Sequence, residues 1–339
     1  MASELWKAAL SATRNRTAPT IPPPFLKETA SHFSPVVMSS LLRLKQNVFS
    51  VEPGPVRTLL TLGFASILID CSNLKRAPCL GYTTKLGMSA DLPFELFLQQ
   101  VAVIKQDLVA LRAKARGWGP PLEVIQANSG MAPIPEGAVD LAITSPPYVN
   151  GMDYVTNYKL DLAWLDFIKS YDELRTLRAA MVACDNIPRE TAASHQANDI
   201  VRSDVWVGSV AKSIDSNIET KAAYRRDDMG AIVTKYFSDL VPVIENVYQS
   251  LKPGGRFVVV NGDSLIAGTY IPGDAIFGRL AEKVGFEVEA FDVARERRSG
   301  QRRGFVLRET ILVLAKPGRR KGAKAPRKRH SLDDFAPPN

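Results

Sequence analysis

The sequence contains little cysteine and little histidine, and this scarcity excludes two kinds of site. Its three cysteines cannot all pair and show no Cys-x-x-Cys spacing; they are Cys71, Cys79 and Cys184. Neither a disulfide framework nor a zinc site is therefore indicated. The three histidines lie far apart along the chain, so their spacing predicts no metal centre and no Ser-His-Asp group.

Long hydrophobic runs are also missing. No apolar segment approaches the roughly 20 residues that a membrane-spanning helix needs. The N-terminus lacks the charged-then-apolar layout of a secretory signal. We therefore expect no membrane association and a cytoplasmic location. The 45% hydrophobic content of the 339 residues is that of an ordinary globular protein with a sizeable core.

Most of the excess positive charge lies in one short segment. The formal net charge is +8, but seven Lys and Arg residues lie between Arg319 and Arg329, and the rest of the chain carries about +1. We interpret residues 318–339 as a basic disordered tail. Such a tail binds polyanions weakly and without sequence preference, or is simply solvated. It supports a nucleic-acid partner without establishing one.

The first third of the chain is predicted to be helical. Residues 1–25 are expected to be irregular because they end in the run Pro22-Pro23-Pro24. Apolar residues then recur with helical spacing over 34–47, 56–70 and 93–115. We assign residues 1–117 to an N-terminal helical region.

After residue 117 the pattern changes to alternating strands and helices. Short apolar runs predict strands over 122–127, 138–144, 256–261, 286–293 and 305–315, and amphipathic spacing predicts helices over 236–251 and 276–284. This alternation implies an α/β fold with a parallel sheet and an antiparallel addition at its end. The run 138–144 is nearly all apolar, as a buried parallel strand requires. We assign residues 118–317 to this domain.

A polar motif, Thr144-Ser145-Pro146-Pro147-Tyr148, stands at the carboxyl end of the strand predicted over 138–144. Open α/β sheets bind ligands at that end of their strands. The two prolines fix the backbone and remove two N–H donors, so the carbonyls of Ser145 and Pro146 can point rigidly into the crevice. Carbonyl and hydroxyl acceptors in this arrangement can hold the protons of an aryl amine and aim its lone pair at a methyl sulfonium. Tyr148 adds a flat face on which an extruded base can stack.

This motif resembles motif IV of the DNA amino-methyltransferases, which has the form (S/D/N)PP(Y/F/W). The Ser version is similar to the branch that methylates N4 of cytosine, whereas Asp or Asn is commoner in enzymes that methylate N6 of adenine. The resemblance continues through residues 149–154 and the helix predicted over 158–167, and it includes Leu251-Lys252-Pro253-Gly254-Gly255-Arg256. It covers roughly residues 122–315.

The resemblance implies a Rossmann-like class I methyltransferase sheet, S-adenosylmethionine as cofactor and double-stranded DNA as substrate. It implies methyl transfer to the N4 amine of cytosine, in restriction–modification or a related defence role. N6 of adenine is the alternative, because both amines present the same geometry. Ser145 corresponds to the acceptor that orients the amine, Pro146 and Pro147 to the rigid backbone beside it, and Tyr148 to the stacking ring. We place Asn128 and Thr144 at the cofactor, although Asn128 fits a plain turn equally well.

One part of the resemblance is missing. Class I methyltransferases bind the methionine moiety with a Gly-rich turn, commonly DPFxGxGT, and no such turn occurs in this sequence. The implied sheet is thus incomplete at its cofactor edge. We hypothesise that the chain is the acceptor half of a split enzyme and that a second methyltransferase subunit carries the Gly-rich motif. A degenerate, inactive relic is the competing explanation. The residues His32-Phe33-Ser34-Pro35 resemble part of a helical region inserted between the two halves in some larger members.

Two segments are candidates for DNA contact. Residues 169–235 exceed what a strand–helix connection needs, so they fit a target-recognition insertion or, nearly as well, a helical lid or partner interface. The turn expected between the last two strands contains four arginines that we predict to contact phosphates: Arg297, Arg298, Arg302 and Arg303. A non-catalytic DNA-binding subunit that recruits an active partner is the alternative from a different class.

The pair Pro78-Cys79 invites comparison with the Pro-Cys nucleophile of carbon-5 cytosine methyltransferases. Those enzymes also need a Glu-Asn-Val partner, and the one here, Glu245-Asn246-Val247, lies inside the amphipathic helix predicted over 236–251. Because the Gly-rich loop is absent as well, we interpret Cys79 as a structural cysteine.

Overall fold

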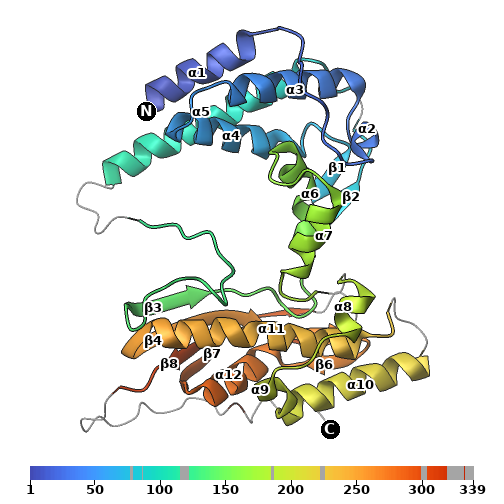
Figure 1. The fold of residues 1–339 in the computed structure, drawn as a ribbon, viewed down its shortest axis with the longest axis vertical. Coiled ribbons are helices and arrows are strands. Elements are labelled where there is room, and N and C mark those ends of the chain that lie inside the picture. The colour runs from blue at the N-terminus through green and yellow to red at the C-terminus, as the bar shows by residue number, and fades with distance from the viewer. Residues whose placement is uncertain are drawn as a thin grey trace. The chain divides into compact units, whose positions relative to one another are not determined.

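The computed structural model describes residues 1–76, 79–85, 87–114, 122–184, 187–221, 226–298, 304–318 and 332. The chain folds into two compact units, each with its own hydrophobic core (Figure 1). The helical unit comprises Met1–Leu122 and Tyr154–Arg178, and the sheet unit comprises Glu123–Asp153 and Ala179–Asn339. The division predicted between residues 117 and 118 did not anticipate that 154–178 returns to the helical unit.

Packed helices make up most of the helical unit. They are α1 Ala2–Arg14, α2 Thr29–His32, α3 Pro35–Phe49, α4 Pro55–Ile67, α5 Leu92–Lys114, α6 Tyr154–Trp164 and α7 Tyr171–Ala179, with a hairpin of β1 Leu74–Arg76 and β2 Leu80–Tyr82. Both α3 and α4 begin at a proline. Proline lacks a backbone N–H, and this suits the first turn of a helix, where N–H groups have no partner within the helix. The helices predicted over 34–47, 56–70 and 93–115 are confirmed as α3, α4 and α5. The expectation that residues 1–25 are irregular is wrong for α1, which buries Leu5 and Ala9 in the helical core.

Trp164 ties the returning segment into the helical core. Its side chain is fully buried, and its ring centroid lies 5.3 Å from that of Phe33 and 6.0 Å from that of Phe64. Arg76 of β1 donates to the main-chain oxygen of Asn157 at 3.1 Å, which joins the hairpin to α6. The segment that follows the Ser-Pro-Pro-Tyr motif along the chain is therefore part of this core.

A four-stranded mixed sheet forms the centre of the sheet unit. Its strands are β3 Val139–Thr144, β4 Leu251–Gly262, β7 Glu287–Arg298 and β8 Val306–Ala315, in the order β3-β4-β8-β7. β3 runs parallel to β4, whereas β8 runs antiparallel to both β4 and β7. The predicted α/β sheet is thus present as a mixed sheet, in which one pairing is parallel and two are antiparallel. A short hairpin of β5 Ser264–Ile266 and β6 Thr269–Ile271 follows β4.

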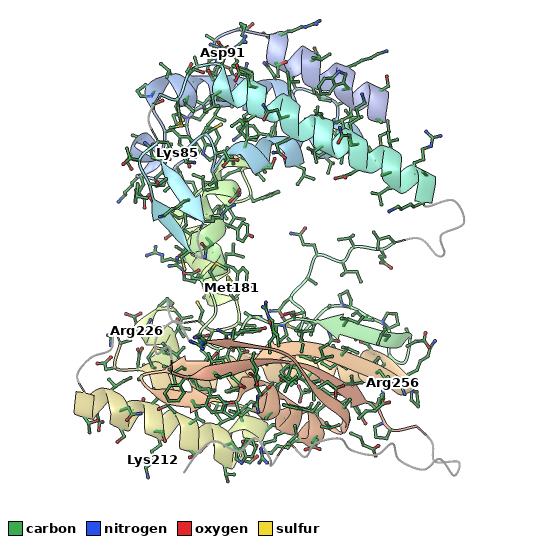
Figure 2. The ribbon with its side chains drawn as sticks, turned by 180° about the vertical axis from the view of Figure 1, so that it is seen from behind. Lys85, Asp91, Met181, Lys212, Arg226 and Arg256 are labelled. Carbon is green, nitrogen blue, oxygen red and sulfur yellow. The ribbon has the colours of Figure 1, made fainter. Side chains whose placement is uncertain are left out.

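Helices cover one face of this sheet. α11 Met229–Ser250 and α12 Gly273–Val284 share a core with the buried side chains of Phe257, Val259 and Leu312 (Figure 1). α8 Arg189–Ala193, α9 Asp199–Arg202 and α10 Val205–Lys221 extend the helical layer, and Figure 2 shows Lys212 on the outer side of α10. α12 ends at Gly285, whose φ of +123° suits glycine and confirms the predicted stop.

Two features of the predicted sheet are wrong. Residues 122–127 form no strand, and Leu122 and Val124 are 92% and 84% exposed. An alternating pattern becomes a strand only when a neighbour takes its backbone hydrogen bonds, and no described segment does so here. The run 138–144 is a strand but not a buried one. It lies at the edge of the sheet, where Leu141 and Ile143 are 51% and 69% exposed.

The predicted tail, residues 318–339, lies outside the described residues except for Gly318 and Leu332. Leu332 is buried in the core of the sheet unit, against Gly278 of α12. A Cβ added at Gly278 would come within 3.1 Å of the Leu332 side chain, so glycine makes room for this contact.

Candidate active site

The Ser-Pro-Pro-Tyr motif leaves the sheet at the carboxyl end of its parallel pair. Thr144, the last residue of β3, lies opposite Val259 of β4, so residues 145–148 and the end of β4 emerge at the same edge. Thr144 is half-buried and Ser145 is exposed. This edge is where sheets with parallel strands bind ligands. The motif therefore occupies the position that the sequence predicts for it.

The ring of Tyr148 is held by three contacts. Its hydroxyl donates to the carboxylate of Glu309 on β8, and the Arg297 guanidinium lies 5.8 Å from the ring centroid. A Cβ added at Gly262 would lie 3.1 Å from Tyr148 Cε2, so the ring packs where only glycine leaves space. Burial and the negative charge of Glu309 raise the pKa of Tyr148. The hydroxyl therefore stays protonated at neutral pH and keeps donating.

The main chain of the motif is fixed as well. The hydroxyl of Tyr236, a fully buried residue of α11, donates to the carbonyl of Pro147 at 2.6 Å. The N–H of Gly151 donates to the carbonyl of Tyr148 at 2.6 Å, and a Cβ on Gly151 would lie 2.6 Å from that same oxygen. The turn after Tyr148 therefore requires glycine. Together the two prolines, α11 and this turn hold residues 145–148 as a rigid shelf, here called the acceptor shelf.

Glu309 connects the acceptor shelf to the outer strand of the sheet. Its second carboxylate oxygen accepts from Arg295 of β7, so the residue bridges Arg295 and Tyr148. The hydrogen bonds from Arg295 and Tyr148 lower the pKa of Glu309. The carboxylate is therefore negatively charged at neutral pH and can anchor both partners.

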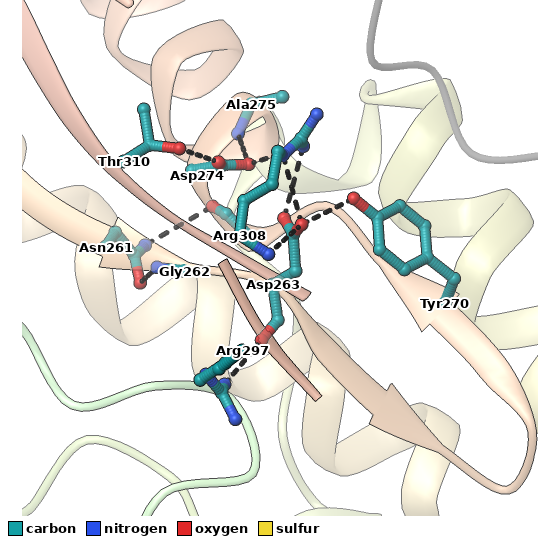
Figure 3. Close-up of polar contacts among 10 residues, drawn as sticks. Asn261, Gly262, Asp263, Tyr270, Asp274, Ala275, Arg297, Arg308 and Thr310 are labelled. Carbon is teal, nitrogen blue, oxygen red and sulfur yellow. Dashed lines mark hydrogen bonds and ion pairs between the residues drawn. The ribbon is translucent and has the colours of Figure 1, made fainter. Parts of the chain in front are cut away.

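Two buried carboxylates lie close to this bridge and share one arginine (Figure 3). Asp263 and Asp274 are fully buried, and Arg308 Nη2 lies 3.2 Å from Asp263 Oδ1 and 3.3 Å from Asp274 Oδ1. Tyr270 donates to Asp263, and Thr310 donates to Asp274, each at 2.6 Å. Burial and the negative charge of Asp263 raise the pKa of Asp274 to about 7. We call these five residues the buried polar cluster.

The main chain of Asp263 links this cluster to the acceptor shelf. Its carbonyl accepts from Arg297 Nη2 at 2.9 Å, and its N–H donates to the carbonyl of Arg308 at 3.0 Å (Figure 3). The end of β4 is thereby fixed against β8 at Arg308, next to Glu309, which accepts from the Tyr148 hydroxyl. Sequence reasoning missed Asp263, Arg308 and Glu309. The available signal was the polar runs 261–264 and 308–310 in strands that are otherwise largely apolar.

The two residues predicted at the cofactor lie in different settings. Thr144 directly precedes the acceptor shelf at the end of β3. Asn128 lies in a turn, where its Oδ1 accepts from the N–H of Gly130 at 2.9 Å. The Asn246 side chain of α11 holds this turn by donating to the Ser129 carbonyl at 2.9 Å. The structure therefore gives Asn128 a local turn contact.

The four arginines predicted to contact DNA are only partly described. Arg297 lies beside the Tyr148 ring, and Arg298 is an exposed residue at the end of β7. Arg302 and Arg303 lie outside the described residues. Arg295, which the prediction did not include, binds Glu309 instead of standing alone.

The segment 169–235 is divided between the two units at residue 178. Several of its arginines form ion pairs with carboxylates of the same segment: Arg175 with Asp172, Arg189 with Asp227, Arg202 with Asp199 and Arg226 with Asp228. These pairs reduce the positive potential that the segment presents to a polyanion. Its role in target recognition stays a prediction.

The described ranges contain neither a candidate metal centre nor a candidate membrane-spanning helix. No group of three or more His, Cys, Asp or Glu side chains there could hold a metal ion. None of the described helices is both long and apolar enough to cross a bilayer. Cys79 is exposed, and Pro78 lies outside the described residues. Asn246 of the Glu-Asn-Val triplet has the structural contact to Ser129 noted above.

Comparison with known proteins finds methyltransferases. The chain is 26% identical over 246 residues to the Type II methyltransferase M.BsoBI of Geobacillus stearothermophilus, which covers 66% of this chain and 48% of that protein. It is 29% identical over 187 residues to the Type II methyltransferase M.AvaI of Nostoc sp., covering 52% of this chain and 38% of that protein. The chain thus spans about half the length, or less, of these curated relatives. No family model matches it.

Among solved structures, the chain is similar to a protein of Thermus thermophilus assigned as a DNA modification methylase. One form of that protein aligns at 18% identity with a TM-score of 0.28, covering 58% of this chain and 55% of the other. Its complex with S-adenosyl-L-methionine aligns at 20% identity with a TM-score of 0.26, covering 57% and 53%.

Proposed function

We propose that this chain is the acceptor half of a DNA methyltransferase that modifies the N4 amine of cytosine in double-stranded DNA, as part of restriction–modification. The observation that carries the proposal is the acceptor shelf. An exposed Ser145 follows a parallel strand at its carboxyl end, two prolines fix the backbone, and Tyr148 is clamped beside them. The similarity to two proteins named Type II methyltransferases supports the same function.

The chemistry required of the shelf is to hold and orient an amine. A target cytosine extruded from the duplex would stack on the half-buried Tyr148 ring. The Ser145 hydroxyl and the Pro146 carbonyl would accept the two N–H bonds, which leaves the nitrogen lone pair aimed away from the shelf. Arg297, beside the ring, would contact the displaced nucleotide, and Arg298 with the predicted Arg302 and Arg303 would contact phosphates. An aryl amine can lose its proton after methylation, so the shelf needs no strong base.

The methyl donor implied for this reaction is S-adenosylmethionine, and the two described residues predicted to bind it, Asn128 and Thr144, do not by themselves form a site for it. The side-chain oxygen of Asn128 already accepts from the N–H of Gly130 within a turn, and Thr144 is a single half-buried side chain at the end of β3. The outer side of β3, where a donor would have to approach the shelf, is bordered by exposed Leu141 and Ile143. We therefore assign the donor site to a second methyltransferase subunit.

Replacing the shelf residues in the source cells tests the function without knowing that subunit. Cells that lack their own copy of the chain are supplied with a variant chain. A wild-type chain should restore N4-methylcytosine in genomic DNA, and the Ser145→Ala and Tyr148→Ala chains should not, as measured by mass spectrometry of the hydrolysed DNA. Binding of the purified variants to duplex DNA should be unchanged in a gel-shift assay. Ser213→Ala, on an exposed serine of α10, is the control and should keep both properties.

Other results identify the other candidates. Loss of N6-methyladenine, with N4-methylcytosine unaffected, assigns the shelf to adenine. Unchanged methylation in both shelf variants would show a DNA-binding subunit whose Ser-Pro-Pro-Tyr motif has no catalytic role.

A further inference from the structure

Within the described part of the sheet unit, no helix covers one apolar face of the outer strand β3. Leu141 and Ile143 lie on it, and the register places them beside Arg256 and Val258 of β4. Leu141 is 51% and Ile143 69% exposed, and the same face continues through half-buried Val258. Helices normally cover both faces of a sheet where its strands are parallel. In the sheet unit, the buried side chains of the opposite face, Phe257 among them, face the helices.

The chain before β3 adds to this uncovered surface. Residues 122–134 contain five exposed apolar side chains: Leu122 at 92%, Val124 at 84%, Ile125 at 43%, Met131 at 75% and Ile134 at 36%. Exposed apolar residues scattered singly need no explanation, but several within one short segment are typical of an interaction surface. Residues 122–127 also have the alternation of a strand without a described partner.

The position of the acceptor shelf at the end of β3 indicates what kind of partner would bind this surface. On the β4 side the shelf is closed by Gly262 and Asp263, which are packed against Tyr148 and Arg308. A methyl donor must reach the amine from the other side, which is the open edge of β3. A strand added in parallel to β3 would end beside Ser145, and ligands bind at the carboxyl ends of such strands.

We propose that the open edge and face of β3 dock a second polypeptide, an S-adenosylmethionine-binding α/β unit whose outer strand pairs in parallel with β3. This inference rests on the proposed function. Backbone hydrogen bonds along β3 would give the pairing its register, and helices of the partner would cover Leu141 and Ile143.

A photocrosslinker at Ile143 identifies the occupant. Residues 1–339 carrying Ile143→p-benzoylphenylalanine are expressed in the source cells and irradiated, and Val205→p-benzoylphenylalanine is the matched control, since Val205 of α10 is 71% exposed. We expect position 143, and not position 205, to crosslink to a second polypeptide. In a separate irradiation of the complex with radioactive S-adenosylmethionine, that second polypeptide should carry the label. A crosslink to a second copy, to residues 1–114 of the same chain, or to an unlabelled polypeptide would overturn the proposal.

Charge substitutions measure the docking itself. Ile143→Asp should weaken the complex roughly tenfold or more, because a buried charge without a partner is unfavourable at an interface, and Val205→Asp should leave it unchanged. Methylation by the Ile143→Asp chain should return when the partner is added in excess, since the shelf is intact. Equal binding by the two variants would contradict docking at β3.

Titration of the purified chain with S-adenosylmethionine gives a third measurement. We expect no saturable binding to the chain alone, and micromolar binding would overturn the proposal. Failure of the proposed function gives a different result: a labelled crosslink at position 143 from a complex that methylates no DNA would keep the docking and refute the N4-cytosine activity.

Discussion

The two outer strands of the sheet end it in different ways. β7 carries charged residues along most of its length, and two register shifts interrupt its pairing with β8. β3 carries a single charge, Asp140, and its apolar side chains Leu141 and Ile143 are exposed. Charges and bulges are the features by which natural sheets prevent further pairing at an edge. β7 therefore closes the sheet, whereas β3 has the composition of a strand that is paired on both sides.

The same contrast applies to the polar groups near each strand. On the β7 side, Arg295 and Arg297 are bound by Glu309 and by the Asp263 carbonyl, and the buried polar cluster satisfies its own charges. On the β3 side, Asp140 has one exposed ion pair with Lys252. The polar groups beside the acceptor shelf on the β7 side thus have partners within the chain. The comparison predicts that variants on the β7 side lower the stability of the isolated chain. Variants on the β3 side should affect only the binding of the proposed second subunit.

The largest effect is expected for Arg308→Ala. Arg308 is the cation between two fully buried carboxylates, and its removal would leave them facing each other without compensation. Breaking a buried ion pair in this way costs about 3–5 kcal/mol of unfolding free energy. Urea denaturation followed by circular dichroism measures the loss, with Arg298→Ala on the exposed end of β7 as the control. A loss no larger than that of the control would show that the cluster does not stabilise the unit.

A smaller effect, on activity, is expected for Glu309→Ala. The variant removes the acceptor that holds the Tyr148 hydroxyl, and one hydrogen bond to a charged group corresponds to roughly a tenfold change in rate. Methylation by the complex should therefore fall about tenfold in kcat, and Tyr148→Phe should fall equally because it breaks the same bond. Glu289→Ala removes an ion pair with Arg256 and is the control. A normal kcat in Glu309→Ala would mean that Tyr148 needs no clamp.

The pH dependence of stability is the third expectation. The folded-state pKa of Asp274, about 7, lies above its ordinary value because of burial and the charge of Asp263. The folded state therefore holds a proton that the unfolded chain releases, and this contribution to stability is lost as pH rises from about 4 to about 7. Glu309, whose pKa is lowered, acts in the opposite direction and loses its contribution as pH falls.

Comparison of the wild type with Asp274→Asn separates the two groups. The wild type should lose stability relative to the variant on the order of 1 kcal/mol per pH unit within that range. Denaturation curves at pH 5, 6 and 7 measure the difference. Parallel pH profiles would contradict a protonated Asp274 in the folded protein.

Periodicity in the sequence predicts elements well and their surroundings poorly. α3, α4, α5 and the strands β4 and β8 lie where the apolar spacing places them, because that spacing depends only on residues near in sequence. The exposure of Ile143 could not be predicted. An apolar residue gives the same sequence pattern whether a helix of this chain or of another chain covers it. The helical pattern of 158–167 likewise does not say that Trp164 joins the core of the N-terminal helices.

The acceptor shelf was predictable because its residues are consecutive. The groups that hold it are not: Tyr148 and Glu309 are 161 residues apart, and Asp263 and Arg308 are 45 apart. Such pairs form only after β4 and β8 have paired, and a single sequence contains no signal of that register. Asn128 illustrates an alternative that the sequence leaves open. Its side-chain oxygen accepts from the backbone two residues away, as a turn residue does, and its role at a cofactor stays a prediction.

The smallest expected effect separates the two faces of the sheet most directly. Val259 of β4 is fully buried under the helices, and Ile143 of β3 is 69% exposed on the other face. Replacing each by threonine keeps the branched side chain, so the cost reflects mainly what covers the position. Val259→Thr should lower the unfolding free energy by about 1–3 kcal/mol through its buried hydroxyl, and Ile143→Thr by about 0.5 kcal/mol or less. If Ile143→Thr costs as much as Val259→Thr in the isolated chain, the helical unit of the same chain covers β3 and no room remains there for a partner. If the two costs differ alone and converge in the complex, the surface that covers β3 comes from the second subunit.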